Sequence, residues 1–138
     1  MTSILAKRMV VSGMADGDVV VLEEPLSFWG GFDSSTGLVI DVHHPQHGAS
    51  LAGAIVVMAS GRGSSSASSV IAEAARVGTS PAALIVMASD EILSTGAIVA
   101  DELYGRPLPI AEVDAAAFAA CVSASRISIA ADGNLTLS

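Results

Sequence analysis

The sequence predicts an α/β fold in which a central βαβ unit is flanked by β-hairpins. Two apolar runs, residues 53–59 and 82–88, have the length and composition of strands that are buried on both faces. Between these runs, Ala67, Val70 and Ala74 recur at spacings of three and four, which places them on one face of a helix. This order of elements is typical of two parallel strands joined by a crossover helix.

The other segments supply the hairpins and further helices. Strands are expected at residues 4–11, 18–22, 36–42, 125–130 and 134–137. A turn at residues 13–17 joins the first two strands, and Asp132-Gly133-Asn134 joins the last two. A short helical turn is expected to end at Thr95, and a longer helix at residues 114–122. We expect the whole chain, residues 1–138, to form one domain.

The composition is acidic and unusually apolar. The formal net charge is -8, which argues against a nucleic-acid partner because phosphates require basic patches. Hydrophobic residues make up 51% of the chain and the mean hydropathy is +0.63, so we expect a partner subunit to cover part of the surface. No run of 18 apolar residues occurs, which predicts no membrane span, and the first residues do not resemble a signal peptide.

The single cysteine, Cys121, restricts the chemistry further. One thiol forms no internal disulfide and fits a reducing, cytoplasmic location. It also cannot hold an iron–sulfur cluster by itself, because such clusters take several thiolates. Its apolar neighbours predict a core position rather than a reactive one.

A glycine- and serine-rich stretch between the first apolar run and the helix is the strongest candidate site. It reads Gly61-Arg62-Gly63-Ser64-Ser65-Ser66, and Arg62 is the only Lys or Arg between Arg8 and Arg76. The start of a helix offers unpaired N–H groups and a positive dipole, so an anion can bind there. The alternative interpretation is ordinary capping of the helix by the serines.

Two other loops carry candidate residues. Residues 26–33 place the only tryptophan and two of the three phenylalanines beside paired glycines, either to anchor the loop in the core or to let the backbone approach another group closely. All three histidines lie in residues 43–47, where Pro45 disrupts metal-ligand spacing. We therefore expect these imidazoles to bond to backbone or substrate rather than to metal.

Three blocks in this order resemble the small subunit of aconitase X-type dehydratases. They are Leu-Ser-Phe-Trp-Gly-Gly-Phe-Asp at residues 26–33, Asp-Val-His-His-Pro at residues 41–45 with Gly48, Ser50 and Gly53, and Gly-Arg-Gly-Ser-Ser at residues 61–65. The similarity extends from Gly13 to about Ile110. It implies a swivelling β/β/α domain similar to the fourth domain of aconitase. It also implies a separate or fused large subunit that carries an iron–sulfur cluster and most substrate contacts, with no metal in this chain.

The resemblance also implies residue roles and a reaction. A serine of the third block is the proton acceptor in relatives, which assigns that role to Ser64, with Ser65 as the alternative register. Relatives dehydrate either cis-3-hydroxy-L-proline or mevalonate 5-phosphate, and the alanine-rich chain with its Phe-Trp-Gly-Gly block favours the former. We expect the following residues to bind the hydroxy-acid substrate: Arg62, Gly63, Ser65, Ser27, Gly31 and His44.

Two other classes of function are compatible with the residues. A stand-alone small-molecule binding module could use the same helix start to hold an anion. A mobile phosphocarrier domain would use a histidine, but His43, His44 and His47 precede the central strand rather than a helix start, which disfavours this alternative. A stable complex with a larger, cluster-bearing protein would distinguish the dehydratase subunit from both.

Overall fold

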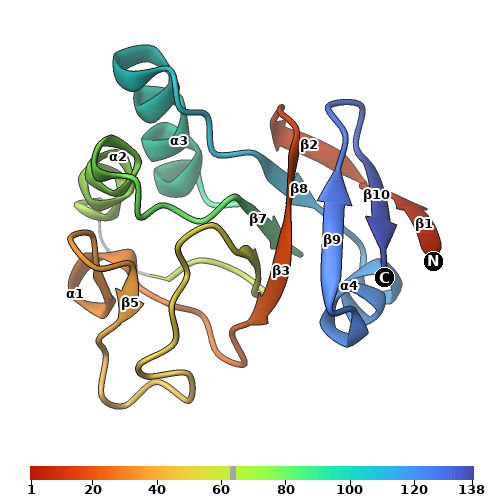
Figure 1. The fold of residues 1–138 in the computed structure, drawn as a ribbon, viewed down its shortest axis with the longest axis horizontal. Helices are drawn as coiled ribbons and strands as arrows, with labels where there is room; N and C mark the ends of the chain where they lie inside the picture. Colours follow the sequence, from red (N-terminus) through yellow and green to blue (C-terminus); the bar gives the residue numbers. More distant parts are fainter. Residues whose placement is uncertain (63–64) are drawn as a thin grey trace.

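The computed structural model describes residues 1–62 and 65–138, and these residues form one large mixed sheet, a small two-stranded sheet and four helices. The strands are β1 (Thr2–Leu5), β2 (Arg8–Val11), β3 (Ala15–Val21), β4 (Phe32–Asp33), β5 (Leu38–Val39), β6 (Ile55–Val57), β7 (Ala83–Val86), β8 (Ile110–Glu112), β9 (Arg126–Ile129) and β10 (Asn134–Leu137). The helices are α1 (Phe28–Gly31), α2 (Ala67–Val77), α3 (Glu91–Tyr104) and α4 (Ala115–Ser123). Figure 1 shows α2 and α3 on one side of the sheet and α4 on the other.

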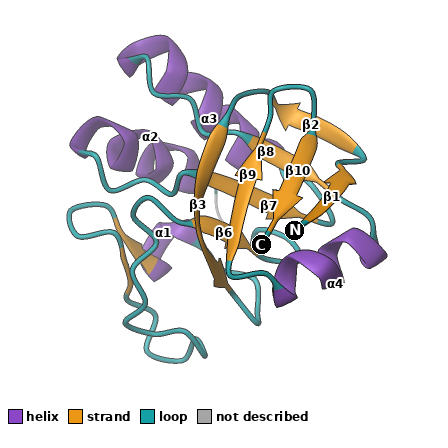
Figure 2. Cartoon of the chain, turned by 45° about the vertical axis from the view of Figure 1, so that its right-hand side comes forward, coloured by secondary structure: helices purple, strands orange, loops and turns teal. Residues whose placement is uncertain are grey.

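The eight-stranded sheet has the order β1-β10-β9-β3-β6-β7-β8-β2, and β4 and β5 form a separate small hairpin. Strands β3, β6, β7 and β8 are parallel to one another, whereas the pairs at both edges are antiparallel. The edge strands β1 and β2 are separated only by Ala6 and Lys7, so the sheet must curl to bring its two edges together. Figure 2 shows this curled sheet with both termini on the same side.

Two cores lie on opposite faces of the parallel strands. Val56, Leu84 and Ile110 belong to the core that α2 and α3 cover. Ile55 and Ile85, one residue out of phase, belong to the core that β9, β10 and α4 cover. Because successive side chains of a strand point to opposite faces, parallel strands that are covered on both faces are apolar throughout.

The central βαβ unit is confirmed, because α2 connects the parallel strands β6 and β7. The carboxyl-terminal hairpin of β9 and β10 and the helix α4 are confirmed as well. Asp114 accepts a hydrogen bond from Ala117 N (2.8 Å) and thereby caps α4. Within the described part of the chain, no helix is long and apolar enough to span a bilayer.

Three predicted elements are wrong. The segment 4–11 divides into β1 and β2, which pair with β10 and β8, so no amino-terminal hairpin forms with β3. The predicted strand at residues 36–42 is reduced to β5. The helix expected to end at Thr95 continues to Tyr104 as α3. Gly96 lets α3 approach α2 closely, since a Cβ on Gly96 would lie 2.9 Å from Ser68 O.

Candidate functional site

The candidate residues gather at the carboxyl edge of the parallel strands. Because β3, β6 and β7 run in the same direction, the segments that follow them leave the sheet at the same edge. Ser27 follows β3, Arg62 follows β6 and Asp90 follows β7. In open α/β sheets, ligands bind in crevices at this edge.

The segment after β6 is packed tightly against the start of α3. A Cβ atom on Gly61 would lie 2.7 Å from Leu93 Cδ1 and 3.2 Å from Asp90 Oδ2, so no larger residue fits without movement. Asp90 caps α3 through a hydrogen bond from Ile92 N to its Oδ1 (2.7 Å). The other carboxylate oxygen, Oδ2, therefore faces the backbone that carries Arg62. Gly63 and the predicted proton acceptor Ser64 lie outside the described residues, and their roles stay predictions.

Arg62 differs from the other cations of the chain. Five of the six Lys and Arg residues contact a carboxylate, a hydroxyl or a carbonyl oxygen of the chain, and they are Lys7, Arg8, Arg76, Arg106 and Arg126. Arg62 is exposed and has no ion pair or hydrogen bond with any described residue. Its guanidinium is therefore available for an external anion.

The start of α2 borders a small open pocket. Ser65, Ser68, Glu91, Ile92 and Thr95 line this space of about 250 Å³. Ser66 occupies the N-cap position of α2 and has helical backbone angles. The hydroxyl of Ser68, in the first turn of α2, donates to Ser65 O (3.0 Å). This bond ties the first turn to the backbone that precedes the helix. The expected contact of Ser65 with substrate is compatible with this exposed position and stays a prediction.

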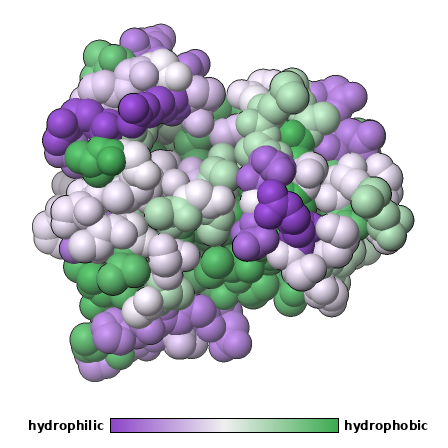
Figure 3. All heavy atoms as spheres, viewed as in Figure 1, coloured by the Kyte–Doolittle hydropathy of each residue, from purple (hydrophilic) through white to green (hydrophobic). Residues whose placement is uncertain are grey.

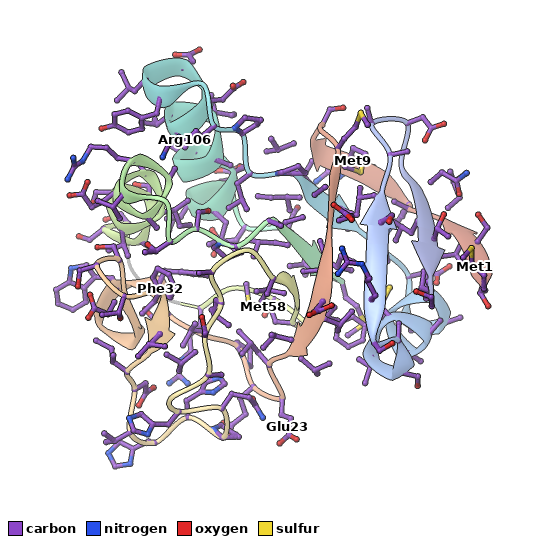
Figure 4. The ribbon with its side chains drawn as sticks, in the orientation of Figure 1. Met1, Met9, Glu23, Phe32, Met58 and Arg106 are labelled. Carbon is purple, nitrogen blue, oxygen red and sulfur yellow. The ribbon has the colours of Figure 1, made fainter. Side chains whose placement is uncertain are left out.

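The α1 segment is held by its own backbone and by the core. Phe28 and Phe32 are buried with ring centroids 5.3 Å apart, which confirms that these aromatics anchor the loop. Ser27 Oγ donates to Trp29 O (2.9 Å). A Cβ on Gly31 would lie 3.0 Å from Leu26 Cδ1, so a larger residue there would press on the buried Leu26. Figure 4 shows Phe32 beside α1, on the side that faces Met58 at the end of β6.

His44 is a structural residue of the loop that joins β5 to β6. Its ring is 7% exposed, Nε2 lies 2.9 Å from Glu24 O, and Nδ1 accepts from Gln46 N (3.0 Å). The Gln46 side chain in turn accepts from Glu23 N (2.8 Å), near the Glu23 label of Figure 4. Both ring nitrogens are thus engaged with backbone groups. The alternative in which the imidazole bonds to backbone is the one observed, and we assign His44 to the structure of the loop rather than to substrate.

A charged cluster at the same sheet edge was missed from the sequence. Glu112 at the end of β8 is largely buried and accepts from Ser89 N (3.2 Å), while Arg8 donates to Ser89 Oγ (2.9 Å). Lys7 and Arg8 also lie within 4.0 Å of the Glu112 carboxylate. Hydrogen bonding to Ser89, followed by the charges of Arg8 and Lys7, lowers the pKa of Glu112. The pairing of β2 with β8 brings Arg8 to Glu112, and the pairing of β7 with β8 brings Ser89 there; no local pattern signals either pairing.

The described residues offer few ligands for the iron–sulfur cluster that the resemblance implies. Among residues 1–62 and 65–138, no three His, Cys, Asp or Glu side chains converge to hold a metal ion. Cys121 is fully buried, and burial raises the pKa of its thiol to about 11. These described residues do not fit an iron–sulfur cluster.

Two sequence relatives cover most of the chain. A cis-3-hydroxy-L-proline dehydratase of Pseudomonas aeruginosa is 46% identical over 108 residues, which are 78% of this chain and 19% of the relative. A phosphomevalonate dehydratase small subunit of Methanothermobacter thermautotrophicus is 45% identical over 93 residues, which are 67% of this chain and 71% of the relative. The chain therefore spans about a fifth of the length of the hydroxyproline dehydratase and most of the length of the small subunit.

A solved structure and a family model agree with these relatives. The crystal structure of Thermococcus kodakaraensis aconitase X in its holo-form superposes with a TM-score of 0.84 at 32% identity and covers 100% of this chain and 99% of that one. The family model described as the aconitase X swivel domain matches residues 4–137. The curled mixed α/β sheet is thus the fold that the resemblance implied. This chain belongs to the aconitase X swivel-domain family.

Proposed function

We propose that this chain, together with a large subunit, removes water from cis-3-hydroxy-L-proline. In this proposal the chain supplies the proton acceptor and a cation that binds the substrate carboxylate. The observation that carries the proposal is Arg62, the cation without an ionic partner among the described residues, at the carboxyl edge of β6. The large subunit is the expected holder of the iron–sulfur cluster, since the described residues of this chain offer no ligand set for one.

The reaction requires a base next to a bound carboxylate. Loss of water from a 3-hydroxy acid removes the proton on the carbon beside the carboxylate; the electron pair of that C–H bond forms the C=C bond, and the C3–O bond breaks with release of hydroxide. We assign proton removal to Ser64 Oγ and carboxylate binding to Arg62. A serine must lose its own proton to act as a base, and the positive field of Arg62 and of the α2 amino terminus favours the resulting alkoxide.

The surrounding residues position these groups. The close packing of Gly61 on Leu93 and Asp90 fixes where the backbone leaves β6. Ser65 and Gly63 are proposed to contribute backbone N–H groups to the substrate carboxylate, as helix starts do for anions. Ser27 and Gly31 are proposed to border the same site, since they lie on the segment that follows the neighbouring strand β3.

Among the described residues, Arg62 is the one cation without a partner, and a single guanidinium suits a substrate with one carboxylate. Mevalonate 5-phosphate carries a phosphate as well, and would need a second cation from the large subunit. Sequence similarity does not separate the two substrates: the Pseudomonas aeruginosa dehydratase matches 108 residues of this chain, a phosphomevalonate dehydratase small subunit of Thermococcus onnurineus matches 131, and the Methanothermobacter small subunit matches 93. The second substrate stays a candidate because that small subunit is 45% identical.

Reconstitution tests the proposal directly. The chain is co-expressed with the large-subunit gene from the same genome, the complex is purified, and water loss is assayed with both substrates. The proposal expects turnover of cis-3-hydroxy-L-proline and iron in the complex but not in the isolated chain. Turnover of mevalonate 5-phosphate alone would overturn the substrate assignment, and a self-sufficient chain that binds no large protein would favour the stand-alone binding module.

A further inference from the structure

Trp29 is the feature of the candidate site that the proposed chemistry does not use. It is the only tryptophan of the chain, and 58% of it is exposed although Phe28 and Phe32 on either side are buried. A single exposed large side chain is ordinary in proteins. An exposed tryptophan whose backbone is held in place, beside a candidate site, instead indicates a binding surface.

The backbone that carries Trp29 is fixed. Trp29 O accepts from Ser27 Oγ (2.9 Å), and Gly30 adopts a φ of 82°, which reverses the chain directly after the tryptophan. Gly31 O accepts from Ile40 N (2.9 Å) and ties α1 to the segment after β5. The indole is thus presented to solvent at little conformational cost, as preorganised binding surfaces require.

Two aliphatic side chains extend this exposed surface. Ile40 is 44% exposed and Val42 is 70% exposed, and Ile40 is hydrogen-bonded through its backbone to Gly31. We call Trp29, Ile40 and Val42 the Trp29 strip. Figure 3 shows apolar patches at the lower left, in the region of β5 and the segment after it, with hydrophilic surface between them. None of these three side chains is charged, as at the centre of a protein interface, although Asp41 lies between Ile40 and Val42 in the chain.

We propose that the Trp29 strip docks the large dehydratase subunit and that Trp29 is its anchoring residue. This inference rests on the proposed function and adds the surface through which the two chains meet. The comparisons indicate the occupant: in the Pseudomonas aeruginosa relative, the part matched by this chain is 19% of a longer protein. The swivel domain of that protein is therefore covalently joined to a much larger remainder, and we infer that this chain contacts the equivalent remainder through its surface.

The position of the strip supports this occupant over a second copy of the chain. Phe28 and Phe32 belong to the same buried core cluster as Ala67 and Ile71 of α2, so the segment that presents Trp29 packs against the helix that follows the candidate site. A large subunit bound to the Trp29 strip would therefore lie beside the candidate site. In the proposed function the large subunit has to contact the substrate there.

The test measures affinity for the purified large subunit. Trp29→Ser and Val42→Ser are compared with Leu103→Ser, a matched control at the end of α3 that is 65% exposed. Anchor residues typically contribute 2 kcal/mol or more, so Trp29→Ser should raise the Kd about 30-fold or more, Val42→Ser less, and Leu103→Ser should leave it unchanged. Circular dichroism and thermal melting verify that each variant is folded.

A second readout reports on the tryptophan itself. The chain labelled with 5-fluorotryptophan has a single ¹⁹F resonance, since Trp29 is the only tryptophan. Addition of unlabelled large subunit should shift and broaden that resonance, and the chain alone should show no concentration dependence.

The outcomes separate the two proposals. If the wild-type chain binds the large subunit and Trp29→Ser binds equally well, the docking surface is wrong and the proposed function stands. If a concentration-dependent shift appears with the chain alone, the strip joins two copies and the inference is overturned. If the wild-type chain binds no large subunit, the proposed function fails and the inference fails with it.

Discussion

Gly61 packs against Leu93 so closely that a Cβ atom on Gly61 would lie 2.7 Å from Leu93 Cδ1. Leu93 is 3% exposed and belongs to the core shared by α2, α3 and the sheet, so it has little room to move. The contact joins the segment that carries Arg62 to the start of α3. It therefore determines how the candidate site is held on the fold.

Gly61→Ala should destabilise the chain and displace the segment after β6. Overpacking costs about 1–3 kcal/mol, which exceeds the gain of about 0.4–1 kcal/mol that alanine brings by restricting the unfolded chain. Urea denaturation measures the change in the free energy of unfolding. The double variant Gly61→Ala/Leu93→Ala tests whether this contact is the cause. Leu93→Ala removes the methyl groups that the new Cβ would strike, so the losses of stability from the two substitutions should not be additive. Strictly additive effects would show that the contact is not responsible.

Arg62→Gln should lower kcat/KM of the assembled dehydratase by about 10- to 150-fold, the range for loss of a hydrogen bond to a charged group of about 1.5–3 kcal/mol. The thermal stability of the isolated chain should not change, since no described residue pairs with this guanidinium. Arg76→Gln is the matched control, because its exposed pair with Glu73 lies on the last turns of α2 and contributes little. Equal activity of the two variants would remove Arg62 from the site.

His44→Ala should destabilise the chain while leaving the reaction intact. The variant leaves Glu24 O and Gln46 N without their imidazole partners, at a cost of about 1–3 kcal/mol. His43→Ala is the control, since that side chain is exposed and its removal should change stability by less than about 0.5 kcal/mol. Thermal melts and kcat/KM of the folded complex separate the roles. Loss of turnover at unchanged stability would return His44 to the substrate site.

Glu112 should give the chain an acid-dependent part of its stability. Hydrogen bonding to Ser89, and then Arg8 and Lys7, lowers the pKa of this carboxyl from its ordinary value of 4.5. A lowered pKa in the folded state stabilises the fold above the unfolded value, and this contribution disappears as the pH falls through the folded value. Glu112→Gln should therefore be less stable than wild type at pH 7, and the difference should shrink below about pH 4.5. A difference that is constant from pH 7 to pH 3 would show that the charge is not involved.

The parts of the fold that depend on local pattern could be predicted. The apolar runs and the helical spacing between them specify β6, α2 and β7, and Asp132-Gly133 specifies the hairpin of β9 and β10. The amino-terminal prediction failed because residues 4–11 contain no Gly, Pro, Asn or Asp that would mark a break at Ala6 and Lys7. The chain changes direction there only to reach both edges of the curled sheet, and this constraint is not local.

The candidate site could be predicted where its residues follow one another in sequence. The stretch around Arg62 is visible as glycines and hydroxyls before a helix, and the resemblance places it in a family. The cluster of Arg8, Ser89 and Glu112 depends on pairing across the sheet. The exposure of Trp29 depends on tertiary packing: Phe28 and Phe32 are buried in the core, and Trp29 between them is exposed. Neither the cluster nor this exposure is encoded in residue spacing.

The most direct test of the central claim is the turnover of cis-3-hydroxy-L-proline by complexes that contain wild-type chain, Ser64→Ala or Ser65→Ala at equal large-subunit content. Removal of a general base costs at least about 100-fold in kcat. We predict a loss of that size for Ser64→Ala and a smaller loss for Ser65→Ala, with both variants still bound to the large subunit. Near-wild-type turnover by the Ser64→Ala complex would contradict the assignment of the proton acceptor to this serine.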